Sequence, residues 1–140
     1  MPEFEYHHVV GFEETNLIGN VYYVNHVRWQ GRCREMFLRE KAPEVLELLE
    51  QGLVLATTRC SCQYHDELKA LDTVVLRMSL QQSIQNRLQL KFEYWRQDKE
   101  GETLVATGEQ EIACMQRQAQ STRPTEIPAA LRNALAPYQP

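Results

Sequence analysis

The chain has 140 residues, of which 43% are hydrophobic and 24% charged, and its formal net charge is −4. That length fits one domain and is enough to bury a core without disulfides or metal ions. The acidic balance argues against a protein that binds nucleic acid or anionic membranes through its overall charge. No apolar run approaches the roughly 18 residues of a membrane-spanning helix, and the first residues show no secretory signal. Four cysteines are too few for a disulfide framework, so we expect reduced thiols in a cytoplasmic protein.

The first third of the chain predicts one strand followed by two helices. The β-prone run Phe4–Phe12 indicates the strand, and turn-forming residues interrupt it at 16–20. Apolar residues at helical spacing predict a long helix over Val24–Leu38, and Pro43 then suits the first turn of a short helix, Pro43–Glu50. For the long helix we expect a buried stripe of Val24, Val27 and Gly31, an adjoining stripe of Cys33, Met36 and Phe37, and Trp29 beside that face.

After Gly52 the hydrophobic period becomes two, which is typical of strands. Four strands are predicted, at Leu53–Tyr64, Thr73–Gln82, Arg87–Trp95 and Thr103–Gln116. In the first of them, the even-numbered residues from Val54 to Tyr64 are expected to share one face. A proline-containing tail follows from about residue 118, with a short helix at Ala129–Leu135.

This order of elements predicts an α+β fold of a single domain, residues 1–140. The long helix has one partner large enough to bury its apolar stripe, an antiparallel sheet of five or six strands. Long strands at the edges of such a sheet expose unpaired backbone groups, so dimerisation is expected.

Two segments resemble the signatures of hotdog enzymes of the 4-hydroxybenzoyl-CoA-thioesterase type. The first is Glu13–Trp29, which contains Thr15, Asn16, Gly19, Val21 and Tyr22 at the spacing of that signature, and the second is Tyr64–Leu68. Together with Gly31–Phe37, they are similar to the enediyne polyketide thioesterases. The resemblance implies the hotdog fold, with the sheet wrapped around the long helix.

The resemblance also implies a reaction and its partners. Enzymes of this kind hydrolyse polyene or β-keto acyl thioesters on the acyl carrier domain of an iterative polyketide synthase. They need no cofactor or metal of their own, because the substrate carries the phosphopantetheine. A homo-oligomer, either a dimer or a dimer of dimers, is expected.

Asn16 occupies the position at which relatives carry a catalytic aspartate. A neutral amide cannot act as base or nucleophile, but it can orient water or the thioester carbonyl by hydrogen bonds. The alternative is a turn asparagine that binds the local backbone. The resemblance places the oxyanion-hole donor at the backbone amide of Tyr23, where the start of the long helix presents free N–H groups.

The resemblance carries Arg34 as a functional residue that binds negative charge or orients substrate. Arg34 is 11 residues beyond Tyr23, about 16 Å along a helix axis, so joint action needs a bent geometry or delivery across a dimer interface. His26 is a candidate for proton transfer near neutral pH or a packing residue. The reserve candidates for a base are Glu35 and Glu67.

Two surfaces are expected to meet the substrate. An apolar acyl pocket is predicted to use Leu17, Ile18, Phe37 or Leu55. A basic patch is predicted to dock an acidic carrier domain, although helical spacing spreads its candidates over more than one face: Arg28, Arg32, Arg39 and Lys41. Arg28 and Arg32 are also rivals of Arg34.

Other classes of function stay open at this stage. The spacing of Cys60 and Cys62 and of His7 and His8 matches no closed zinc site, and buried free cysteines are expected instead. No phosphate loop or serine nucleophile elbow is present. A CoA thioesterase of primary metabolism, a hotdog dehydratase or hydratase, and a non-catalytic acyl-binding protein remain alternatives.

Overall fold

The computed structural model describes residues 3–140. In chain order the elements are β1 (Phe4–Val9), the 3-10 turn η1 (Phe12–Glu14), α1 (Val24–Lys41), α2 (Pro43–Glu50), β2 (Leu53–Tyr64), β3 (Thr73–Ile84), β4 (Arg87–Asp98), β5 (Gly101–Arg117), β6 (Thr122–Pro124), α3 (Ala129–Leu135) and the 3-10 turn η2 (Ala136–Tyr138). Within the described residues, no helix combines the length and the hydropathy needed to cross a membrane.

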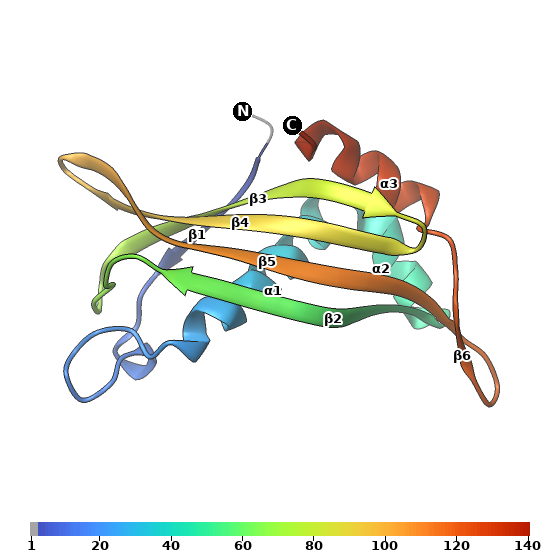
Figure 1. The fold of residues 1–140 in the computed structure, drawn as a ribbon, viewed down its shortest axis with the longest axis horizontal. Helices are drawn as coiled ribbons and strands as arrows, with labels where there is room; N and C mark the ends of the chain where they lie inside the picture. Colours follow the sequence, from blue (N-terminus) through green and yellow to red (C-terminus); the bar gives the residue numbers. More distant parts are fainter. Residues whose placement is uncertain (1–2) are drawn as a thin grey trace.

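The strands form one antiparallel sheet in the order β1-β3-β4-β5-β2, and short β6 pairs with β5. The three helices lie on one face of this curled sheet (Figure 1). The predicted α+β architecture is confirmed, and it is that of the hotdog fold. Strands β1 and β2 are the two edges, and both retain backbone groups that the sheet does not use.

Helix α1 packs on the sheet with a stripe that differs from the predicted one. Val24 is 42% exposed, whereas Trp29 is 2% exposed and belongs to the core. The buried side of the first two turns is largely polar, with Asn25, His26 and Gln30 all buried. The prediction that Val24, Val27 and Gly31 form the buried stripe was therefore wrong. A search for apolar residues overlooks a helix face that buries polar side chains.

The first strand ends at Val9, earlier than predicted. The Val10 backbone N–H binds the Asp72 carbonyl at 2.9 Å. The chain then turns into η1, where the Gly11 N–H donates to the Glu14 carboxylate at 2.9 Å. This capping contact stops the extended backbone before Phe12, although the residues themselves favour a strand.

Strand β2 contains a bulge that changes which side chains face the helix. Its register with β5 shifts between Thr57 and Arg59, which leaves Thr58 as the extra residue. Because side chains alternate along a strand, one extra residue reverses the pattern. Leu55 and Thr57 consequently face α1, and the prediction that the even-numbered residues share one face all along β2 was wrong.

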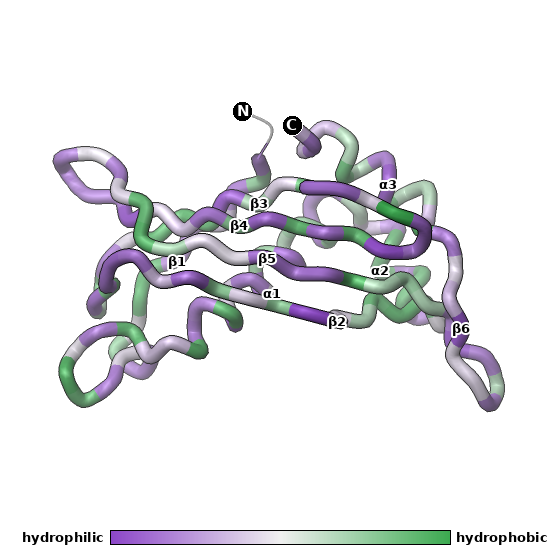
Figure 2. The backbone as a smooth tube through the Cα atoms, viewed as in Figure 1, coloured by the Kyte–Doolittle hydropathy of each residue, from purple (hydrophilic) through white to green (hydrophobic). Residues whose placement is uncertain are grey.

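Exposed apolar side chains gather at one end of the molecule, around the loop that precedes α1. Figure 2 shows this loop as hydrophobic at its tip. Leu17 is 105% exposed and Ile18 is 82% exposed, and Tyr22, Tyr23 and Tyr64 are also exposed. Cys60 is exposed as well, so its predicted burial was wrong. One end of the molecule therefore presents a hydrophobic surface to its surroundings.

Candidate active site

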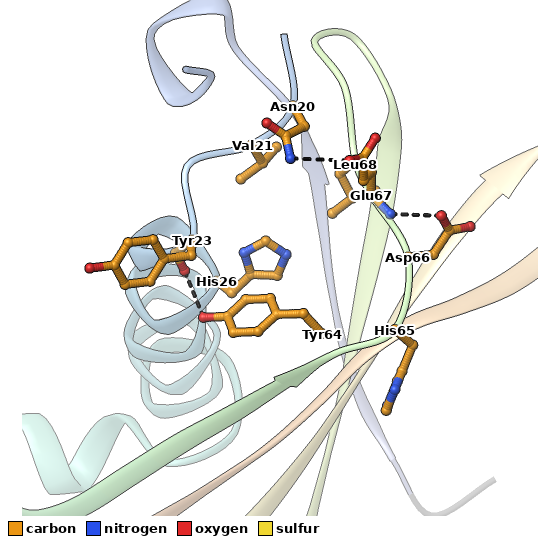
Figure 3. Close-up of a pocket in the computed structure, with 9 residues that line it drawn as sticks. All are labelled: Asn20, Val21, Tyr23, His26, Tyr64, His65, Asp66, Glu67 and Leu68. Atoms are coloured by element: carbon orange, nitrogen blue, oxygen red, sulfur yellow. Dashed lines mark hydrogen bonds between the residues drawn. The ribbon is translucent and has the colours of Figure 1, made fainter. Parts of the chain in front are cut away.

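The start of α1 forms one wall of a hollow of about 300 Å³. Tyr23 precedes the first helical residue, and its side chain makes no cap. Among residues 3–140, no group accepts a hydrogen bond from the Tyr23 backbone N–H. The Tyr64 hydroxyl reaches over from the end of β2 and donates to the Tyr23 carbonyl at 2.8 Å (Figure 3). The predicted oxyanion donor is thus a free amide on a fixed backbone.

His26 lies on the inner side of the same hollow, between α1 and the sheet. Its ring contacts Tyr64 edge-on, with 4.7 Å between ring centroids, and the residue is 3% exposed. Burial lowers the pKa of His26 to about 4, because the cation would lose its hydration. Neither ring nitrogen has a hydrogen-bond partner within residues 3–140. At neutral pH His26 is therefore uncharged, able to accept a proton but not to supply one.

Asn16 lies in an exposed turn that is closed by its own hydrogen bonds. Its Oδ1 accepts the Ile18 N–H at 3.0 Å, and its carbonyl accepts the Gly19 N–H at 3.0 Å. Gly19 has a φ of +94°, which this turn requires. The turn-asparagine alternative accordingly describes part of its role. One lone pair of Oδ1 and the Nδ2 group remain for a water or a substrate.

Glu14 holds the Asn16 loop against β1 and α1, a role that sequence reasoning missed. Its carboxylate accepts hydrogen bonds from His8 Nε2 at 2.8 Å, Trp29 Nε1 at 2.8 Å and the Gly11 N–H. Burial raises the pKa of Glu14, but the hydrogen bonds from Gly11, His8 and Trp29 outweigh burial and hold the pKa below its usual value.

The backbone of Glu14 also shapes the start of the helix. Its carbonyl accepts the Tyr22 N–H and the Asn25 Nδ2 group, each at 2.9 Å. The Tyr22 amide is thereby paired, whereas the Tyr23 amide has no acceptor among residues 3–140. A carboxylate two residues before Asn16 was the available signal in the sequence, but its partners come from separate elements.

The Arg34 side chain lies outside this hollow, between α1 and strands β2 and β5. Its guanidinium donates to Thr57 Oγ1 at 2.9 Å, to Gln110 Oε1 at 3.2 Å and to the Leu55 carbonyl at 3.3 Å. Within residues 3–140, no carboxylate forms an ion pair with it, since Glu35 pairs with Arg32 instead. Burial lowers the pKa of Arg34, although Glu35 acts against this from a distance. The group nevertheless remains a cation at pH 7.

Beneath Arg34 lies a small apolar cavity of about 20 Å³, with space for one water molecule. Its walls come from α1, the sheet and α3, and they include Phe37, Leu55, Met78, Leu131 and Leu135. Phe37 and Leu55 were predicted to line an acyl pocket. Leu17 and Ile18, predicted with them, lie at the exposed loop tip instead.

The candidate residues fall into three places within one chain. Tyr23, His26 and Glu67 line the hollow at the start of α1. Asn16 lies on the neighbouring loop beside Arg28, and Arg34 lies at the apolar cavity. Glu35 is on the solvent side of α1, where it binds Arg32 at 3.3 Å. A single chain thus does not bring Arg34 to the Tyr23 amide.

Comparisons with known proteins identify the family of the chain. Residues 10–135 match the family described as the Thioesterase-like superfamily. The dynemicin thioesterase, a protein that shows induced-fit and allosteric effects upon polyene binding, has a solved structure that is 42% identical, with a TM-score of 0.95. The alignment covers 99% of this chain and 98% of that one. No curated protein matches the sequence.

More distant structures share the fold alone. A 4-hydroxybenzoyl-CoA thioesterase variant in complex with 4-hydroxybenzoyl-CoA has a TM-score of 0.85 at 16% identity, covering 97% of this chain and 100% of that one. A gentisyl-coenzyme A thioesterase has a TM-score of 0.78 at 24% identity, covering 94% and 98%.

Proposed function

The chain belongs to the thioesterase-like hotdog superfamily and is a thioester hydrolase, and from this premise we propose that it releases a polyene or β-keto acyl chain from an acyl carrier domain in enediyne polyketide biosynthesis. The observation that carries the proposal is the 42% identity to the dynemicin thioesterase over 99% of the chain. The phosphopantetheine arrives on the substrate. The four free thiols suit a reducing, cytoplasmic location.

The apolar cavity supports a long hydrocarbon substrate. Its lining is entirely aliphatic and aromatic apart from Arg34, which suits an acyl chain with a polar function along it. Since the cavity holds only about 20 Å³, side chains must move to admit the chain. Leu131 and Leu135 of this lining come from the short helix α3.

The proposed reaction is a direct attack of water on the thioester carbonyl carbon. Asn16 orients the water or the carbonyl, and the Tyr23 N–H donates to the oxyanion, a contact that contributes about 3 kcal/mol in comparable sites. Collapse of the tetrahedral intermediate breaks the C–S bond, and the proton lost by water passes to the thiolate. His26 and Glu67 line the same hollow and are the candidates that carry this proton.

A dimer formed through β2 would complete the site. The edge of β2 is exposed from Thr57 to Ser61 and again at Tyr64, so two copies can pair antiparallel there. Pairing centred between Cys60 and Ser61 sets Tyr64 of one chain opposite Thr57 of the other. Because Tyr64 binds Tyr23 and Thr57 binds Arg34, Arg34 of the partner subunit would then approach the oxyanion donor. Dimers of this kind could associate further into tetramers.

The outer face of α1 offers a docking surface for an acidic carrier domain. Arg28, Arg32 and Arg39 are all exposed, and their spacing of four and seven residues places them on one side of the helix. Lys41, two residues beyond Arg39, lies on another side of the helix and is not part of the basic patch. Complementary charge would speed encounter with the carrier domain more than it would tighten binding.

A thiol-release assay tests the proposal. The same polyene acyl group is presented on an acyl carrier domain, on CoA and on free pantetheine, and a thiol-trapping reagent reports the rate. We expect the highest kcat/KM on the carrier domain, and we expect Arg28→Glu with Arg32→Glu to reduce that value alone. A kcat/KM that is highest on CoA would instead indicate a CoA thioesterase of primary metabolism, and equal values on all three carriers would contradict carrier-domain docking.

A further inference from the structure

The environment of Arg34 is unusual because the cation is half-buried and bound only by neutral groups. Its three acceptors are a hydroxyl, a side-chain amide and a backbone carbonyl. Gln110 itself is 5% exposed. A half-buried guanidinium normally pairs with a carboxylate, because an uncompensated charge in a desolvated place is costly. Here no carboxylate of residues 3–140 neutralises the charge of Arg34, so an unpaired positive charge lies beside the apolar cavity.

The sheet is shaped to supply these neutral acceptors. The bulge at Thr58 turns Thr57 towards α1, where its hydroxyl meets Arg34. Thr58, the extra residue, instead points to the outer face and binds Glu111 Oε1 at 2.8 Å. The carboxylates of β5 that flank Gln110, those of Glu109 and Glu111, alternate to that outer face as well. The inner side of β5 thus presents an amide to Arg34 at a position between two glutamates.

We propose that Gln110 and Thr57 are positioning residues that fix the Arg34 guanidinium without neutralising it, so that its charge serves an oxygen anion of the bound acyl chain. That anion is an enolate, an oxyanion or the carboxylate of the released acid. This inference rests on the proposed role of Arg34 and names the residues through which Arg34 acts. A carboxylate at position 110 would pair with Arg34 and stabilise the fold, but it would neutralise the charge that the reaction needs.

The isosteric substitution Gln110→Glu tests this directly. The new carboxylate would pair with Arg34, so we expect the midpoint of thermal unfolding to stay unchanged or to rise, while kcat on an acyl-pantetheine thioester falls by about tenfold or more. Lowering the pH should restore part of the activity relative to the unaltered protein, because the introduced carboxyl group is neutral once protonated and then resembles the native amide. Arg34 is the charged side chain that faces position 110, and Glu35 is the next one that acts on Arg34. Gln81→Glu, on exposed β3 surface, is the control and should change neither quantity.

A second pair of variants tests the inference even if Gln110→Glu does not fold. Thr57→Val replaces a hydroxyl group by a methyl group of similar size on an edge strand, so the variant should fold. We expect it to lower kcat several-fold with little change in KM, and we expect Thr57→Ser to retain the activity. If both Gln110→Glu and Thr57→Val turn over the pantetheine substrate at the unaltered rate, the inference is wrong. Failure of the proposed function is a separate result, since it would show as a loss of preference for the carrier domain.

Discussion

At the scale of single residues, His26 makes a prediction about stability. In the folded chain its pKa is about 4, below the ordinary value near 6.5. Between these two pH values His26 is protonated in the unfolded chain and neutral in the folded chain. Stability is therefore complete above about pH 6.5 and falls as the pH drops towards 4, by about 3 kcal/mol in all. Urea unfolding at pH 7 and pH 4.5 should show this loss, and His26→Gln should lack most of it. An equal loss in both proteins would assign the effect to other groups.

Glu14 makes a second prediction at this scale. Three N–H donors converge on its carboxylate, from Gly11, His8 and Trp29. The amide of Glu14→Gln offers one acceptor atom, so one buried donor or more loses its partner. We expect a loss of about 1–3 kcal/mol in the free energy of unfolding, measured by urea denaturation. Glu13→Gln, at the exposed neighbouring position, is the matched control and should be nearly neutral.

Site residues were predictable from the sequence only where a local motif carries them. Asn16 and Tyr23 stand in one short segment, and the resemblance of that segment was enough to single them out. Thr57 and Gln110 are 53 residues apart and meet only because β2 and β5 are neighbours. A bulge of one residue decides whether Thr57 reaches Arg34, and side-chain alternation alone does not reveal such a bulge.

At the scale of elements, glycine positions test how closely α1 lies on the sheet. A Cβ at Gly108 of β5 would stand 2.7 Å from the Ser61 carbonyl oxygen and would also strike the Gln30 amide. Gly108→Ala must therefore shift α1 or β2, and we expect it to cost about 1–3 kcal/mol of stability. Gly31→Ala in α1 meets nothing within 4 Å, and it should stabilise the protein by up to about 1 kcal/mol. Thermal unfolding of the two variants should shift in opposite directions.

The same helix shows why element positions were predictable and burial was not. Hydrophobic period and proline placement predicted α2, β2 and α3 with the bounds observed. The buried face of α1 depends instead on partners such as the Glu14 carbonyl for Asn25 and the Ser61 carbonyl for Gln30. Those acceptors are set by the packing of distant strands, so a stripe of apolar residues was the wrong guide.

At the scale of the whole molecule, the proposed mechanism requires an active site shared between two chains. Asn16 and Tyr23 lie at one end of α1, and Arg34 lies about three turns further along at the apolar cavity. In the proposed dimer paired through β2, Arg34 of the partner subunit would lie close to the first place. Exposed Leu17, Ile18 and Tyr64 at the same end of the molecule favour such a contact, because a free hydrophobic surface of this kind is costly in water.

Mixing two inactive variants tests the shared site. Asn16→Ala and Arg34→Ala are each expected to lose most thiol-releasing activity. If the site combines Asn16 of one chain with Arg34 of the other, a mixed dimer contains one intact site and one that lacks both groups. Refolding an equal mixture should then recover about a quarter of the unaltered activity, since about half of the dimers are mixed. If each chain supplies a complete site, every site lacks one group, and the mixture stays as inactive as its components. Sedimentation of the mixture provides the control that dimers have formed.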